Sequence, residues 1–169
     1  MSRIVAWTGH RPDIFRDPDA ARTAVDTIAH ELVAPAKPER FLVGGQRGVD
    51  TWAAHAAITL DVPFTLILPL EVAQFTSTWS SADRAVLESV VAQANEVRIV
   101  GPSSDPTAAY SERNRQLATR ADLLVAVWTQ LQGGGTAETV ALAKAAGTPI
   151  REVVLPIAQI AHSAHGRGI

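Results

Sequence analysis

Two glycine-rich stretches and one arginine are the parts of this chain whose residue types and spacing suggest chemistry. The first stretch, Gly44-Gly45-Gln46-Arg47-Gly48, follows an apolar run and precedes an expected helix that Asp50 would cap. Glycine permits a positive φ and a close approach of the backbone, and the free N–H groups of a first helical turn attract anions. The stretch predicts a phosphate site, to which Arg47 would add donors. The alternative is a tight turn that merely requires glycine, because neither common nucleotide fingerprint fits.

The second glycine-rich stretch is Gly133-Gly134-Gly135-Thr136, again between an apolar run and an expected helix. The Thr136 hydroxyl can cap that helix or bind a phosphate. Glu138 lies one turn into the helix, where its carboxylate can hold ribose hydroxyls. A glutamate that the helix dipole favours in the first turn is the alternative for Glu138.

Arg113 occupies a position where helical spacing alone asks for an apolar residue. A helix expected from 107 to about 121 has an inward stripe of Tyr110, Arg113 or Asn114, Leu117 and Ala121. A buried guanidinium requires an anionic or carbonyl partner. A ligand phosphate or carboxylate is one candidate, and an acidic residue on a neighbouring element is the other.

The elements that must position these residues alternate between strands and helices. Apolar runs predict strands at 4–8, 40–43, 63–68, 96–100, 123–128 and 149–155, with helices between them. The run 123–128 is expected to be central because both of its faces are apolar, and 69–79 is expected to be a surface loop or lid. The alternation predicts an α/β fold, a doubly wound, mostly parallel sheet with helices on both faces.

Ligands in such sheets lie at the carboxyl ends of the strands, so Gly9, His10 and Arg11, after the first strand, are expected to form a third wall. No metal site is expected. His162 and His165 have the spacing of a helical ligand pair, but they lie in a tail expected to be frayed, without an acidic partner.

Composition excludes several protein classes. With 169 residues, 47% hydrophobic and 19% charged, the chain suits one well-buried domain. A net charge of −2 with two lysines disfavours non-specific nucleic-acid binding. The absence of cysteine, of a signal-like N-terminus and of an apolar run near the roughly 20 residues that span a bilayer favours a cytoplasmic protein without membrane contact.

The three stretches together resemble a known superfamily. Gly44 to Asp50, followed by Ala54-His55, is similar to the S-G-x-A-R-G-I-D-x-x-A-H segment of DNA-processing protein A (DprA), and Arg113-Asn114-Arg115 resembles its R-N-R segment. Gly133 to Glu138 resembles the glycine-threonine turn that DprA shares with the "Lonely guy" (LOG) phosphoribohydrolases. The order of the three segments indicates the SLOG superfamily, and the opening residues 8–12 resemble its small stand-alone branch of YpsA and YspA proteins.

The resemblance implies a Rossmann-like domain over residues 1–156, a tail at 157–169 and a nucleotide pocket without a separate cofactor. It supplies candidate catalytic residues, Arg113 and Glu138. The expected ligand-binding residues are Gly9, His10, Arg11, Gly44, Gly45, Gln46, Arg47, Gly48, Asp50, Asn114, Gly133, Gly134, Gly135 and Thr136. The chain departs from LOG enzymes at the last glutamate of their motif, because Thr139 stands there and a threonine cannot stabilise an oxocarbenium-like transition state.

Three functions follow. The first is binding of a nucleotide or a nucleotide-derived small molecule. The second is LOG-like hydrolysis of the N-glycosidic bond of nucleoside 5′-monophosphates, with Glu138 replacing the missing carboxylate. The third is a DprA-like nucleic-acid interaction module, which the charge of the chain disfavours.

We predict a homodimer, because members of this superfamily commonly self-associate and the alanine- and valine-rich helices carry more apolar surface than one sheet covers. Light scattering at micromolar concentration is expected to give twice the monomer mass. A clean monomer whose mass does not change with concentration would contradict this prediction.

Overall fold

Six parallel strands form the centre of the protein, in the order β4-β3-β2-β1-β5-β6. The structure is a computed structural model, and it describes residues 3–159. The strands are β1 (Ile4–Gly9), β2 (Arg40–Val43), β3 (Phe64–Leu68), β4 (Glu96–Ile99), β5 (Leu123–Trp128) and β6 (Ile150–Val154). All five neighbouring pairs are parallel, so the α/β fold with a parallel sheet is confirmed.

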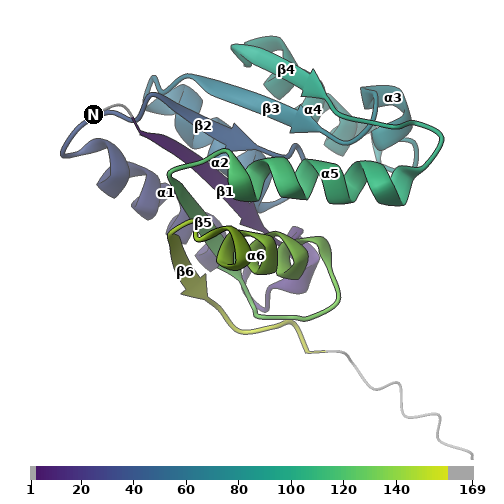
Figure 1. The fold of residues 1–169 in the computed structure, drawn as a ribbon. Coiled ribbons are helices and arrows are strands. Elements are labelled where there is room, and N and C mark those ends of the chain that lie inside the picture. Colours follow the sequence, from purple (N-terminus) through teal and green to yellow (C-terminus); the bar gives the residue numbers. More distant parts are fainter. Residues whose placement is uncertain (1–2, 160–169) are drawn as a thin grey trace, which may run out of the picture.

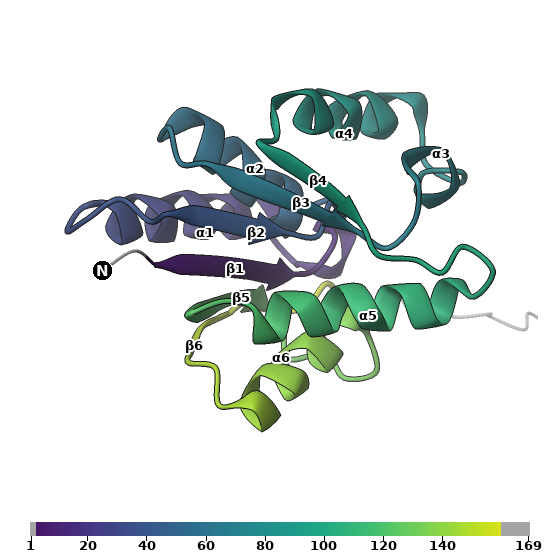
Figure 2. The same ribbon diagram turned by 45° about the horizontal axis from the view of Figure 1, so that its top comes forward.

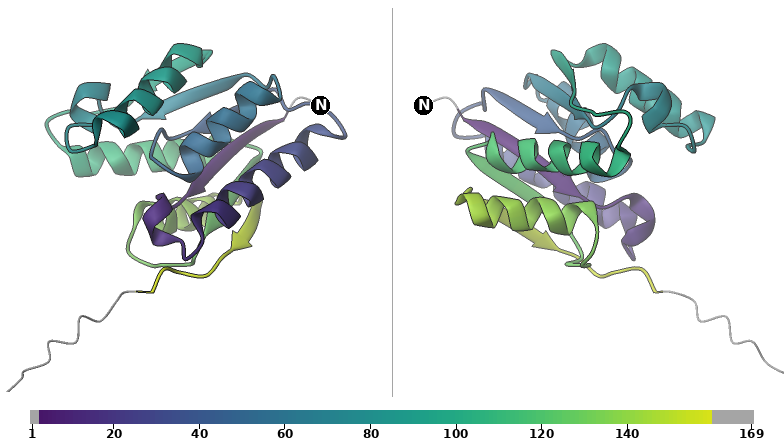
Figure 3. Two further views of the ribbon diagram at one scale, coloured as in Figure 1. Left: turned by 180° about the vertical axis from the view of Figure 1, so that it is seen from behind. Right: turned by 45° about the vertical axis from the view of Figure 1, so that its right-hand side comes forward.

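Helices cover both faces of the sheet (Figures 1 and 2). The first face carries α1 (Pro18–Val33), α2 (Val49–Thr59) and α4 (Ser81–Gln93), and the second carries α5 (Pro106–Thr119) and α6 (Gly135–Ala146). Figure 3 shows α5 and α6 side by side across the second face. A 3-10 turn, η1 (Pro12–Ile14), follows β1, and the single-turn helix α3 (Val72–Phe75) follows β3.

The sheet reverses its direction of winding at β1. Strands β1 to β4 are added outward on one side, and the chain then crosses through α5 to place β5 on the other side of β1. This makes β1 and β2 the central strands, so the prediction that 123–128 is central was wrong, although β5 lies inside the sheet and is almost fully buried. A reversal of this kind opens a crevice at the carboxyl ends of the two diverging strands.

Three of the helices, α1, α4 and α5, begin with a side-chain cap, whereas α2, α3 and α6 do not. Asp17 and Ser80 accept hydrogen bonds from Ala20 N and Asp83 N, as expected of helix caps. At α2 the cap is Gly48, which lacks a side chain, so the prediction that Asp50 caps this helix was wrong. The Asp50 carboxylate turns back instead and accepts the Gln46 N–H at 3.0 Å.

The segment 69–79, predicted as a surface loop or lid, is a loop only in part, because it contains α3 and two buried aromatic residues. Phe75 and Trp79 are buried, with their ring centroids 5.1 Å apart, and the Phe75 ring lies 5.9 Å from that of Tyr110 on α5. The burial of two aromatic rings fixes this segment against the body of the protein.

The start of the predicted tail contacts the body. Ile157 pairs with Phe15 in an isolated antiparallel bridge, and the Ala158 N–H donates to Ile14 O at 2.9 Å. The boundary at 156 stays a prediction, and residues 160–169, on which most of the predicted frayed tail falls, lie outside the described residues.

Gly48 is expected to be irreplaceable. Its φ is +87°, and a Cβ there would collide with the carbonyl oxygen of His10, which is backbone and cannot move aside. We expect Gly48→Ala to lower the free energy of unfolding by at least about 3 kcal/mol, since backbone strain and overpacking add.

The matched control is Gly147→Ala at the end of α6, where φ is +74° but nothing lies within 4 Å of an added Cβ. This change is expected to cost only about 1–2 kcal/mol, the cost of the left-handed conformation. Urea unfolding of both variants measures the difference. Equal losses would show that crowding at Gly48 is unimportant.

Candidate functional site

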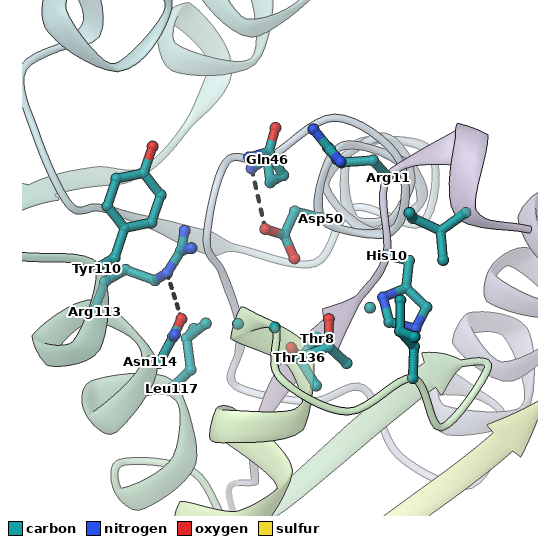
Figure 4. Close-up of a pocket in the computed structure, with 15 residues that line it drawn as sticks. Thr8, His10, Arg11, Gln46, Asp50, Tyr110, Arg113, Asn114, Leu117 and Thr136 are labelled. Atoms are coloured by element: carbon teal, nitrogen blue, oxygen red, sulfur yellow. Dashed lines mark hydrogen bonds between the residues drawn. The ribbon is translucent and has the colours of Figure 1, made fainter. Parts of the chain in front are cut away.

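A cavity of about 300 Å³ opens at the carboxyl end of β1, between the turn that follows β2 and the start of α6 (Figure 4). Its walls come from residues before 51 and after 109. The lining residues are Thr8, Gly9, His10, Arg11, Ile14, Gln46, Asp50, Tyr110, Arg113, Asn114, Leu117, Leu131, Gly134, Gly135 and Thr136.

Arg113 lies at the bottom of one wall, with a side chain that is only 6% exposed. Its Nη1 donates to Gly44 O at 2.5 Å and its Nε donates to Asn114 Oδ1 at 2.9 Å. Its Nη2 has no partner among the described residues, and its guanidinium carbon lies 5.6 Å from the centre of the Tyr110 ring. A carbonyl and an amide oxygen, and no acidic side chain, thus accept two of the hydrogen bonds of the guanidinium within the described residues. Arg113 also lines the cavity, and its contact with a ligand anion stays a prediction.

Asp50 faces Arg113 across Gly44. A Cβ added to Gly44 would lie 2.6 Å from Arg113 Nη1 and 2.9 Å from Asp50 Oδ2, so a side chain there would force one of the two charged groups to move. Within residues 3–159, Asp50 and Arg113 interact through their charges but form no direct ion pair. Asp50 Oδ2 accepts the Gln46 N–H, while Oδ1 has no partner in the same set of residues and points into the cavity (Figure 4).

Burial raises the pKa of the Asp50 carboxyl from its ordinary value of 3.8 to about 6. The Arg113 charge and the Gln46 N–H act in the opposite direction, but burial outweighs them. Other charged or titratable groups around the same cavity are Tyr110, His10, Arg11 and, beyond Arg113, Glu138. A carboxylate held in this environment costs stability near neutral pH.

The start of α6 supplies unpaired donors. Gly134 is its N-cap and provides no side chain, so the N–H groups of the first turn have no cap and face the cavity with Thr136. Asn114 lies opposite, because its Nδ2 would be 3.4 Å from a Cβ on Gly135. The Asn114 Oδ1 is engaged by Arg113, which leaves Nδ2 as a further free donor within the described residues.

His10 forms the opposite wall and is fixed in place. It shares a 3.1 Å hydrogen bond with Thr129 Oγ1, and its ring lies against Phe15 and Trp128. Burial, and to a lesser degree the charge of Arg11, lowers the pKa of His10, so the imidazole is neutral at neutral pH. A neutral imidazole offers the cavity a polar group without a charge.

The first glycine turn uses several of its donors internally. Gln46 N donates to Asp50, Arg47 N to the side chain of Gln46, and Val49 N to His10 O. The Arg47 side chain turns toward α4, where Nη1 lies 3.6 Å from Asp83 Oδ2 and the guanidinium lies over Trp79. Arg47 therefore does not line the cavity.

An outer groove of about 680 Å³ continues from the cavity between α5 and the start of α6. Tyr110, Asn114, Gly134 and Gly135 belong to both hollows, and Glu138 and Gly133 line only the outer one. Thr139 is fully buried and its hydroxyl donates to Gly135 O at 2.8 Å. The position that corresponds to the LOG glutamate is therefore buried beneath α6 and lines neither the cavity nor the groove.

The structure brings most of the predicted site residues to one cavity. Those that line it are Gly9, His10, Arg11, Gln46, Asp50, Arg113, Asn114, Gly134, Gly135 and Thr136, and those that do not are Gly44, Gly45, Arg47, Gly48, Gly133 and Glu138. The predicted site did not include Thr8, Ile14, Tyr110, Leu117 and Leu131, although Tyr110 and Leu117 stood on the expected inward stripe of their helix. Thr8 was recognisable because it ends a strand at the ligand edge of the sheet; Ile14 and Leu131 lie in connections whose direction only the fold reveals.

Residues 3–159 contain neither a candidate metal site nor a candidate membrane-spanning helix. No group of three metal-ligating side chains is close enough to hold an ion, and no helix is long and apolar enough to cross a bilayer. His162 and His165 lie outside the described residues.

The sequence model of the YspA SLOG family (YpsA) matches residues 5–150. The chain belongs to this family. The match covers both glycine turns and Arg113, so the SLOG assignment made from those segments is confirmed. None of the curated proteins compared with this family member matches it significantly.

Solved structures share the fold of this YspA SLOG family member. DprA from Streptococcus pneumoniae aligns with a TM-score of 0.65 and 16% identity over 89% of this chain and 50% of DprA. The molybdenum cofactor (Moco) carrier protein from Chlamydomonas reinhardtii aligns with a TM-score of 0.60 and 21% identity over 90% of this chain and 76% of the carrier. The chain spans half the length of DprA, and identities this low establish the fold alone.

The raised pKa of Asp50 predicts that this site residue destabilises the protein at high pH. As pH rises from 3.8 to about 6, the unfolded chain loses the carboxyl proton before the folded chain does, so stability falls across that window. By pH 8 the cost is roughly 3 kcal/mol. We therefore expect Asp50→Asn to be more stable than the wild type at pH 8 and nearly equal to it at pH 4.

Urea unfolding at both pH values measures this difference, with Asp26→Asn, an exposed aspartate on α1, as the control that should not change it. An Asp50→Asn protein that is less stable at pH 8 would show that attraction to Arg113 outweighs the cost of burial.

Proposed function

We propose that this protein binds a nucleotide or a nucleotide-derived small molecule, with the anionic group of the ligand at the start of α6. The observation that carries the proposal is the convergence of unpaired donors on one cavity: Arg113 Nη2, Asn114 Nδ2 and the uncapped N–H groups of the α6 first turn. Donors of this kind, partly desolvated and held rigidly, bind phosphate strongly.

The second glycine turn is the better candidate for the phosphate. At the first turn, three N–H groups are already engaged and the Asp50 carboxylate would repel an anion. At the second turn the nearest side chains are the donors Arg113 and Asn114 and the hydroxyl of Thr136. We therefore assign to Gly44, Gly45 and Gly48 the work of shaping the cavity, and to Gly134, Gly135 and Thr136 the contact with the ligand.

The size of the site suits a nucleotide. The inner cavity is near the lower end of the range for small-molecule sites, and the groove beside it gives room for a base or another attached group. The carrier protein of the same fold is named for a small-molecule cargo, which is consistent with this use of the fold.

A LOG-like N-glycosidase is the second candidate function. Its support is that Glu138 lines the groove next to the proposed phosphate position, so a carboxylate is present although Thr139 replaces the expected one. In that reaction Arg113 would orient the 5′-phosphate and the carboxylate would stabilise the charge that develops on the sugar.

Arg113→Ala is expected to remove nucleotide binding. We expect calorimetry with AMP, GMP, CMP and UMP to show binding to the wild type, and Arg113→Ala to cost about 2–5 kcal/mol of affinity because a desolvated ion pair is lost. Arg113→Lys should restore only part of the affinity, since an ammonium cannot donate to Gly44 O and the ligand in the same geometry. Chromatography of each mixture tests for free base, which only a glycosidase releases.

The matched control is Arg115→Ala on the same helix, because Arg115 is exposed and pairs with Glu112. It should leave affinity unchanged. Since Arg113 also holds Gly44 O, the Ala variant is expected to melt at a lower temperature, so affinities are compared where both proteins are folded. Normal affinity in folded Arg113→Ala would mean that Arg113 is a structural residue only.

A further inference from the structure

Asp50 carries a charge that its structural work does not require. Its side chain is 5% exposed, and Oδ2 holds the turn by accepting the Gln46 N–H. A neutral asparagine would accept the same hydrogen bond without the cost of burying a carboxylate. The free oxygen, Oδ1, faces the cavity and has no donor within the described part of the chain. A buried carboxylate with one unpaired oxygen at a cavity wall calls for a hydrogen-bond donor, and a bound ligand can supply that donor.

The position of Asp50 identifies the part of the ligand that meets it. Asp50 Oδ2 and Arg113 Nη1 flank the same point beside Gly44, at 2.9 and 2.6 Å from where a Cβ would lie. A ligand anion that reaches Arg113 Nη2 therefore has its next group beside Asp50. In a nucleoside 5′-phosphate that next group is the ribose, because the sugar separates the phosphate from the base.

Charge fixes the direction of the ligand. The Asp50 carboxylate repels a phosphate, whereas the start of α6 and Arg113 attract it, so the phosphate is held on the α6 side and the sugar on the Asp50 side. An ionised carboxylate can only accept hydrogen bonds, and the two neighbouring hydroxyls of a ribose can both donate to it. Carboxylates recognise ribose in this way in dinucleotide-binding folds.

Resting on the proposed function, we infer that Asp50 accepts hydrogen bonds from the ribose hydroxyls of the bound nucleotide and makes the site selective for ribonucleotides. The assignment differs from one to Glu138, whose carboxylate lines the outer groove and not the cavity beside Arg113.

The test compares nucleoside 5′-monophosphates with their 2′,3′-dideoxy counterparts by calorimetry. We expect the wild type to bind the ribonucleotide roughly 10- to 100-fold more tightly, the range for hydrogen bonds to a charged group. Asp50→Asn is expected to weaken ribonucleotide binding relative to dideoxynucleotide binding, so that the ratio falls toward one. Dideoxynucleotide binding itself should be equal or somewhat tighter, because the repulsion between the carboxylate and the phosphate is removed. Asp26→Asn, the same chemical change at an exposed position on α1, should keep the wild-type ratio, and Glu138→Gln tests the competing assignment of the hydroxyls to the outer groove.

Each contrary result has a separate meaning. Equal binding of both nucleotides to the wild type overturns the role of Asp50 and leaves the proposed function standing. A preference that survives in Asp50→Asn, or one that disappears in Glu138→Gln instead, assigns the hydroxyls to another residue and also overturns the inference. Failure of every nucleotide to bind a folded wild type overturns the proposed function and the inference together.

Discussion

The burial of one guanidinium governs the arrangement of this site. Arg113 lies almost completely out of water, and its hydrogen bond to Gly44 O joins residues that are 69 positions apart in the chain. A charge in that position requires compensation. Gly44 O, Asn114 Oδ1 and the nearby charge of Asp50 provide part of it, while Nη2 stays open toward the cavity. The same contact demands glycine at 44, because any side chain would enter the space between Arg113 and Asp50.

The two glycine turns look alike in sequence but do different physical work. The first turn is closed, because its glycines allow close contacts with the backbone that follows β1, with Leu68 and with Arg113. Several of its N–H groups donate hydrogen bonds to neighbouring residues. The second turn is open, since an added Cβ at Gly133 or Gly134 would meet nothing within 4 Å. Glycine leaves room for crowded neighbours in the first turn and leaves the backbone exposed in the second.

The order of strands and helices was predictable because apolar runs and capping residues such as Asp17 and Ser80 act locally. The place of Arg113 on a cavity wall was predictable because a charge on an apolar stripe is an anomaly in any fold. The direction of Arg47 was not, since it depends on Trp79 and Asp83 approaching from α4. The capping role predicted for Asp50 was wrong for a related reason. Capping rules consider a single helix, whereas the Asp50 carboxylate accepts a hydrogen bond from the turn before the helix and interacts electrostatically with Arg113 on α5.

The cavity draws no wall from residues 51–109, which include β3, α3, α4 and β4. That half of the sheet ends in an edge strand whose Val97 and Ile99 are partly exposed. Substitutions along this edge change the outer surface without changing any residue that lines the cavity. The architecture thus places the cavity where β1 meets β5 and leaves the exposed β4 edge, on the far side of the sheet, as a surface that can change without altering the cavity wall.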